Sequence, residues 1–236
     1  MDSESSLRER LVDVGVDLVL SEGSASLGLR EIARRAGVSH GAPRRYFPTH
    51  HALLSAIARR GFADLGARFA TALADATTAR DQLRAVARVY VGFALERRGM
   101  FELMFRHDLL DSEQSEQSEQ RGADQPRLRE STLPLFEHIV ALVARCRAEQ
   151  GTAHQPGGPD GTATGAAVTA AALWSNLHGI AQLWAWGSLP LVLDAQLPDG
   201  APRVARLDDQ LGDRLDDRLD QFVAAVLDTH LGPVSS

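Results

Sequence analysis

The sequence has no lysine, a single cysteine and few aromatic side chains, which make up 6% of its 236 residues. One cysteine, Cys146, excludes an internal disulfide framework and a metal site built from several cysteines. No stretch approaches the ~18–20 apolar residues that a membrane-spanning helix requires, so we expect no membrane association. Residues 1–10 are polar and lack the apolar core of a signal peptide, which favours a cytoplasmic protein.

Alanine and leucine are abundant, and hydrophobic residues make up 44% of the chain, enough to bury a core. Apolar residues recur every three or four positions over most of the sequence, and no alternating strand pattern is found. The longest such stripe comprises Leu54, Ile57, Phe62, Leu65, Phe69 and Leu73. A second stripe comprises Leu83, Val86, Tyr90 and Phe93. The pattern predicts an all-α fold of about nine helices.

Two short helices are predicted close together near the N-terminus. The first spans residues 29–36 and is ended by Gly37, a residue suited to a left-handed helix cap. The second is predicted to begin at Ser39 and to run to about Phe47, with Pro43 inside it. Two short helices joined by a glycine turn, with arginines on both, are typical of a helix-turn-helix.

Charge is distributed unevenly along the chain. Residues 28–62 contain seven arginines and one acidic residue, whereas residues 63–236 contain 16 arginines and 24 acidic residues. A basic segment on an acidic body favours a protein that binds nucleic acid, although a solvated helix face would have the same composition.

The sequence from Leu29 to Leu54 resembles the DNA-binding signature of TetR-type transcriptional repressors, and the resemblance extends over residues 7–62. It departs from that signature at Arg44, which replaces a phosphate-binding tyrosine, and at His50, which replaces a lysine. Pro43 within the recognition helix is the third departure. Arginine can still bind a phosphate, whereas a histidine carries less charge at neutral pH.

The resemblance implies a double-stranded DNA operator as partner and a role for each position of the motif. The residues implied to contact backbone phosphates are Arg30, Ser39, Arg44, Tyr46 and His50. The candidates for contact with base edges are His40, Ala42 and Arg45, and Gly41 beside them is small enough for close approach to the groove. Tyr46 and Phe47 have an alternative role, because either can pack in the core of the small domain.

The second half of the chain resembles the ligand-sensing domain of the same family. Trp174, His178 and Gly179 resemble a Trp-His-Gly signature of one branch of these regulators. The effector-binding candidates are Tyr90, Phe101, Met104, Phe105, Trp174 and His178, each of which has ordinary core packing as its alternative. Soft and aromatic side chains favour a small apolar or aromatic effector.

The expected organisation is a DNA-binding domain over residues 1–50 and a ligand-sensing and dimerisation domain over residues 51–236. A polar loop with a repeated Ser-Glu-Gln motif, about residues 107–126, is expected to be mobile, and residues 187–202 are expected to be a second connection. Cys146 lies on an apolar stripe and is expected to be buried and inert.

The hypothesis is a homodimeric one-component repressor, without metal or cofactor, that leaves a palindromic operator when the effector binds. The Trp-bearing helix and the last helix would pack against those of the partner as a four-helix bundle. An enzyme is the rival class, but the sequence has no zinc-protease motif, phosphate loop or nucleophile motif. A helical dimer that binds another protein would leave the basic segment unexplained.

Overall fold

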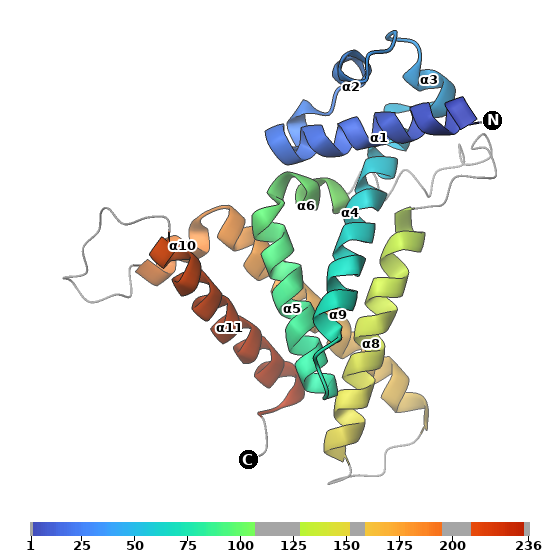
Figure 1. Ribbon diagram of the computed structural model, residues 1–236. Helices are drawn as coiled ribbons and strands as arrows, with labels where there is room; N and C mark the ends of the chain where they lie inside the picture. The colour runs from blue at the N-terminus through green and yellow to red at the C-terminus, as the bar shows by residue number, and fades with distance from the viewer. Residues whose placement is uncertain (1, 107–127, 152–158, 195–208, 234–236) are drawn as a thin grey trace. The chain divides into compact units, whose positions relative to one another are not determined.

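The computed structural model describes residues 2–106, 128–151, 159–194 and 209–233 (Figure 1). Helices are the only regular elements in these ranges, and no strand occurs in them, which confirms the all-α fold. No helix among the described residues is long and apolar enough to cross a membrane. The predicted mobile loop at residues 107–126 lies outside the described residues.

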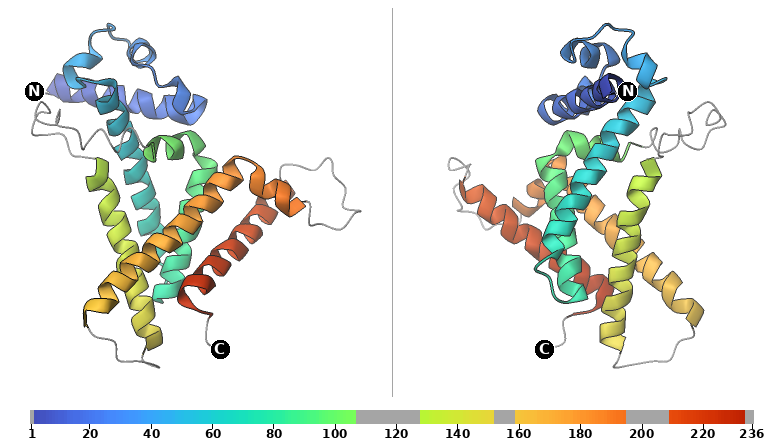
Figure 2. Two further views of the ribbon diagram at one scale, coloured as in Figure 1. Left: turned by 180° about the vertical axis from the view of Figure 1, so that it is seen from behind. Right: turned by 45° about the vertical axis from the view of Figure 1, so that its right-hand side comes forward.

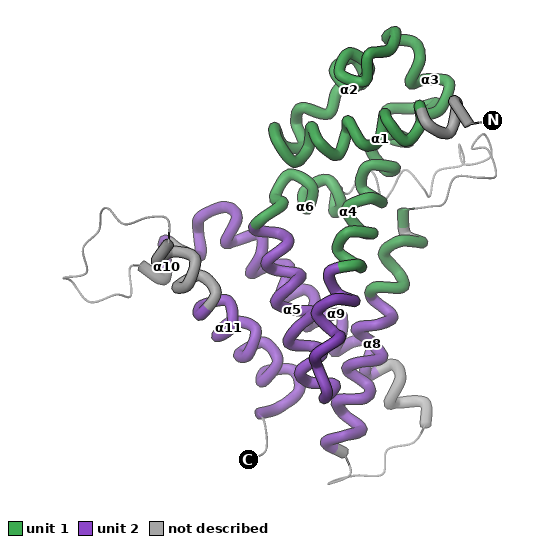
Figure 3. The backbone as a smooth tube through the Cα atoms, in the orientation of Figure 1, with its two compact units in different colours: residues 1–67, 96–135 green, residues 68–95, 136–236 purple. Residues whose placement is uncertain are grey.

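The chain forms two compact units, shown in green and purple in Figure 3. The first comprises residues 1–67 and 96–135, and the second comprises residues 68–95 and 136–236. Helix α4 (His50–Leu73) contributes residues to both units. The functional division expected after residue 50 does not coincide with these units and stays a prediction.

The first unit contains the basic segment of the sequence. Its elements are α1 (Asp2–Glu22), the 3-10 turn η1 (Ser24–Ser26), α2 (Leu29–Arg35), α3 (Pro43–Tyr46), most of α4, α6 (Arg98–Met104) and the first turns of α8 (Leu128–Gly151). The side chains of Leu11, Leu18, Ile32, Phe47, Leu53 and Ile57 are fully buried. Gly15 lets α1 approach α4 closely, because a Cβ atom there would lie 2.3 Å from Cδ1 of Ile57.

The second unit is built from α5 (Ala79–Glu96), the remainder of α8, α9 (Pro159–Ala185), α10 (Ser188–Asp194) and α11 (Asp209–Leu231). Helices α9 and α11 lie side by side (Figure 2), and the rings of Trp184 and Phe222 meet edge to face at 6.0 Å. Ion pairs join α5 to α11, and the buried Arg80 forms one of them with Asp228. The stripe of apolar residues predicted on α5 is buried throughout.

Two sequence expectations for this unit have definite outcomes. Cys146 is buried, as predicted, and burial raises the pKa of its thiol. The predicted connection at residues 187–202 is wrong in its first part, because α10 occupies residues 188–194. Leu191 and Val192 of α10 are 72% and 59% exposed, so these two apolar residues do not mark a buried helix face in the sequence.

Candidate functional site

Helix α2 ends in a tight, glycine-dependent turn. Gly37 has φ of 67°, in the left-handed region that favours glycine, and its N–H donates to the carbonyl of Arg34 at 3.2 Å. The N–H of Val38 donates to the carbonyl of Ala33 at 3.0 Å. This pair of bonds is a Schellman cap. The left-handed cap predicted at Gly37 is therefore confirmed.

Helix α3, the recognition helix of the motif, is shorter than predicted. It begins at Pro43 instead of Ser39, and the preceding residues form a turn in which the N–H of Ala42 donates to the carbonyl of Ser39 at 2.9 Å. Proline has no N–H, so Pro43 cannot form the helical bond back to Ser39 that the prediction required. The N–H of Arg45 donates to the carbonyl of Ala42 at 3.2 Å, and the N–H of Phe47 donates to the carbonyl of Pro43 at 2.9 Å.

The side chains predicted to contact DNA lie on the outer surface of this motif. The exposed ones are Arg30, Ser39, His40, Gly41, Arg44, Arg45 and His50, and the half-buried ones are Ala42 and Tyr46. Phe47 is fully buried, which confirms its alternative role in the core. Arg8 of α1 lies over the Phe47 ring, 5.3 Å from its centroid. The sequence did not indicate this contact between Arg8 and Phe47, because only the tertiary fold brings α1 beside α3.

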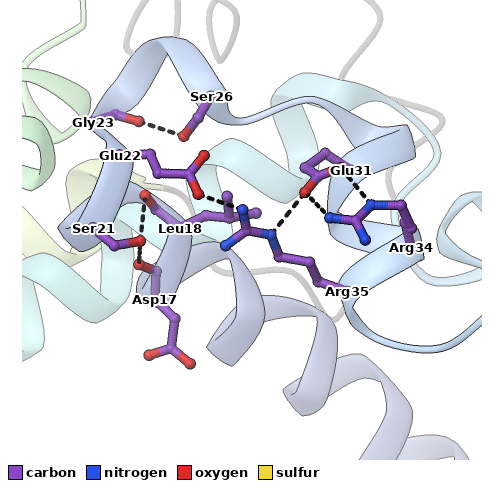
Figure 4. A network of polar contacts seen from close by, with 9 residues as sticks. All are labelled: Asp17, Leu18, Ser21, Glu22, Gly23, Ser26, Glu31, Arg34 and Arg35. Atoms are coloured by element: carbon purple, nitrogen blue, oxygen red, sulfur yellow. Dashed lines mark hydrogen bonds and ion pairs between the residues drawn. The ribbon is translucent and has the colours of Figure 1, made fainter.

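Two of the arginines of α2 are held in ion pairs (Figure 4). Arg34 donates to Glu31 at 2.6 and 2.8 Å, and Arg35 donates to Glu31 at 2.7 Å and also to Glu22 of α1. Hydrogen bonds from Arg34 and then Arg35 lower the pKa of Glu31 from 4.5 to about 2. Arg35 therefore links α2 to the end of α1, whereas Arg34 pairs with Glu31 within α2.

Three other arginines of the motif carry uncompensated charge. Arg30, Arg44 and Arg45 are exposed, and among the described residues none of them has a carboxylate within 4.0 Å. We call these three residues the arginine group. Their positive charge is available to a negatively charged partner.

Helix α4 is anchored at its first turn. The Thr49 hydroxyl accepts the N–H of Ala52 at 3.1 Å, and Nε2 of His50 lies 2.6 Å from the carbonyl oxygen of Leu27, just before α2. The His50 bond thus links the start of α4 to the start of α2, a contact that the sequence did not indicate.

In the second unit, Tyr90 of α5 meets Trp174 and His178 of α9. The indole Nε1–H of Trp174 donates to the Tyr90 hydroxyl at 3.0 Å, and that hydroxyl lies 2.8 Å from Nδ1 of His178. Since indole can only donate, the hydroxyl accepts from Trp174, while Nε2 of His178 lies 3.4 Å from the side-chain amide nitrogen of Gln182. Burial raises the pKa of Tyr90 and lowers the pKa of His178, which favours the neutral form of both side chains.

The six effector-binding candidates therefore divide between the two units. Tyr90, Trp174 and His178 are joined by hydrogen bonds in the second unit, whereas Phe101, Met104 and Phe105 belong to the first. There Phe105 packs edge to face on Phe62 of α4, with ring centroids 5.6 Å apart. The role predicted for these residues stays a prediction. Among the described residues, no cluster of three or more His, Cys, Asp or Glu could hold a metal ion.

Several solved structures are similar to the whole chain. A protein of unknown function from Rhodococcus sp. RHA1 is 28% identical over 95% of this chain and 93% of its own, with a TM-score of 0.61. A putative transcriptional regulator from Pseudomonas aeruginosa PAO1 is 16% identical over 97% and 91%, with a TM-score of 0.58. A transcriptional regulator from Rhodococcus sp. RHA1 is 21% identical over 97% and 99%, with a TM-score of 0.57. The last two similarities show the fold alone.

No curated protein sequence matches the chain. Residues 11–57 match the family described as bacterial regulatory proteins, tetR family, and include α2, α3 and the start of α4. Residues 83–199 match the tetracyclin repressor-like C-terminal domain, which includes Tyr90, Trp174 and His178. The chain therefore carries a tetR-family N-terminal domain, with its DNA-binding helix-turn-helix, followed by a tetracyclin repressor-like C-terminal domain.

Proposed function

We propose that the chain is a homodimeric transcriptional repressor, not an enzyme, that leaves a palindromic operator when a small apolar or aromatic effector binds its C-terminal domain. The observation that carries the proposal is the arginine group: three exposed cations, on the two short helices of the helix-turn-helix, that have no carboxylate partner in the described part of the chain. Phosphate contacts supply most of the affinity in such complexes, and arginine suits them because it always carries charge.

The proposed DNA contacts follow the exposed surface of the motif. Arg30, Ser39, Arg44, Tyr46 and His50 bind backbone phosphates, and His40, Ala42 and Arg45 reach base edges, with Gly41 allowing close approach. In a dimer, two such motifs occupy successive major grooves, so the operator half-sites lie ~34–36 Å apart.

The proposed effector response begins in the second unit. We assign Trp174, His178 and Gly179 to the Trp-His-Gly signature, and two of these side chains hold the Tyr90 hydroxyl. An effector that binds one arrangement of this domain better than another shifts the population toward it. Because α4 is continuous through both units, a displacement of this helix would change the DNA-binding motif. The faces of α9 and α11 pack against those of the partner.

Binding to DNA from beside the chain's own gene tests the proposal, measured by fluorescence anisotropy at ~50 and ~200 mM salt. The double substitution Arg44→Ala and Arg45→Ala is expected to abolish selective binding and to reduce the salt slope by about 0.9 for each phosphate that is no longer neutralised. Arg34→Ala is the matched control, because Arg34 is exposed but already paired with Glu31. Operator binding that survives in the double variant would overturn the proposal.

A further inference from the structure

The hydrogen bond between His50 and Leu27 fixes where the histidine carries its proton. A carbonyl oxygen only accepts hydrogen bonds, so Nε2 of His50 must be the donor across the 2.6 Å contact. The neutral ring is consequently the Nε2–H tautomer, and its Nδ1 bears a lone pair instead of a hydrogen.

That tautomer cannot donate to DNA. Phosphate oxygens only accept hydrogen bonds, and a lone pair on Nδ1 repels them, whereas the protonated ring offers both an Nδ1–H and a positive charge. Protonation leaves the Nε2–H bond to Leu27 intact. We propose that His50 contacts a DNA phosphate only with its ring doubly protonated, so that operator binding takes up a proton. The inference rests on the phosphate contact assigned to His50 under the proposed function.

In the DNA-free protein, no carboxylate among the described residues lies close enough to His50 to stabilise its protonated ring. The segment it contacts, residues 24–28, has no ionisable side chain. Helix α2 carries Arg30, Glu31, Arg34 and Arg35, α3 carries Arg44, Arg45 and Tyr46, and His51 follows His50 in α4. The carboxylate among them, Glu31, is already bound to Arg34 and Arg35. Among the described residues no carboxylate lies within 4.0 Å of a His50 ring nitrogen.

The direction in which operator affinity changes with pH follows from this arrangement. A bound phosphate favours the charged ring, so proton binding and DNA binding favour each other. Operator affinity therefore rises as the pH falls through the range from about 8 to about 5 in which histidines change charge. One coupled proton corresponds to an affinity change of at most about tenfold per pH unit.

The test is operator binding at about pH 6 and about pH 8, each at two salt concentrations. His50→Gln keeps an N–H for Leu27 but cannot become charged, and His50→Lys is charged at both values. For the wild type we expect tighter binding and a salt slope steeper by about 0.9 at the lower pH. His50→Gln should lose both differences, and His50→Lys should keep the steep slope at both pH values. His51→Gln, the neighbouring histidine, should behave as the wild type.

Melting of the DNA-free variants, followed by circular dichroism, shows whether each is folded. If folded His50→Gln retains the wild-type pH dependence, another group takes up the proton and the inference is overturned while the regulator stands. A His50→Lys slope that changes with pH as the wild-type slope does would also overturn it. If the wild type binds the DNA at neither pH, the proposed function itself fails.

Discussion

Replacement of Gly99 by alanine tests the close packing of α6 against α1. A Cβ atom at Gly99 would lie 2.7 Å from the carbonyl oxygen of Val19 and 2.9 Å from Cα of Gly23. Both are backbone atoms, which cannot rotate away as a side chain does. Overpacking of this kind costs about 2–3 kcal/mol, and alanine recovers up to about 1 kcal/mol through its better helix propensity. We therefore expect Gly99→Ala to lower the free energy of unfolding by about 1–2 kcal/mol.

Gly92→Ala in α5 is the matched control, because apart from its chain neighbours and the backbone of its own helix no atom of the described residues lies within 4 Å of the added Cβ. It should raise the free energy of unfolding by about 0.5–1 kcal/mol, since only the helix propensity changes. Urea unfolding followed by circular dichroism, at one protomer concentration, measures both variants. The corresponding shifts in melting temperature should be opposite in sign, by about 2–4 °C per kcal/mol. A Gly99→Ala variant as stable as Gly92→Ala would refute the reasoning.

Three further predictions concern single groups. The lowered pKa of Glu31 adds stability that is complete above pH 4.5 and is lost as the pH falls toward about 2, so Glu31→Gln should remove that part of the pH dependence of urea unfolding. Tyr90→Phe leaves Trp174 and His178 without their shared partner and should lower the free energy of unfolding by about 1–3 kcal/mol; an unchanged urea midpoint would contradict the hydrogen-bond assignment. The raised pKa of the buried Cys146 thiol predicts slow reaction with a chromogenic thiol reagent in the native protein and rapid reaction in urea, whereas equal rates would show an accessible thiol.

The long helices could be predicted from the sequence because each buries one face. Leu54, Ile57, Phe62, Leu65 and Phe69 recur at helical spacing, and all five are buried in the structure. Burial of one face of a helix imposes a period near 3.6 residues on the sequence, so α4 and α5 can be predicted from the sequence alone.

The start of the recognition helix could not be predicted by the same rule. Ser39 is a favourable cap, but a cap fixes a helix only if the following N–H groups can continue the hydrogen-bond ladder. Pro43 has no N–H, so the ladder lacks the bond back to Ser39 that a helix starting at this cap would need. The effect of a missing donor therefore outweighed the preference of the capping residue.

Within the candidate site, contacts between residues close together in the sequence could be predicted, whereas contacts between separate helices could not. Glu31 precedes Arg34 and Arg35 by three and four residues, a spacing at which helix side chains meet. By contrast, Arg35 meets Glu22 and Tyr90 meets Trp174 only because separate helices pack together. The sequence could indicate a basic motif, but only the tertiary pairs show which of its arginines are compensated.

Some arginines of the motif are bound to carboxylates and others are not, and this difference decides which of them can attract DNA. Arg34 and Arg35 add to the basic charge counted along the sequence, yet they are bound to carboxylates and strengthen the motif rather than its attraction for DNA. Attraction at short range depends on charges that have no partner of their own, because a paired arginine must first break its pair to meet a phosphate. The arginine group and a protonated His50 have no carboxylate partner among the described residues. The strength and the pH dependence of DNA binding should therefore follow these few side chains, and the net charge of −6 should have little influence beyond a Debye length of ~8–10 Å.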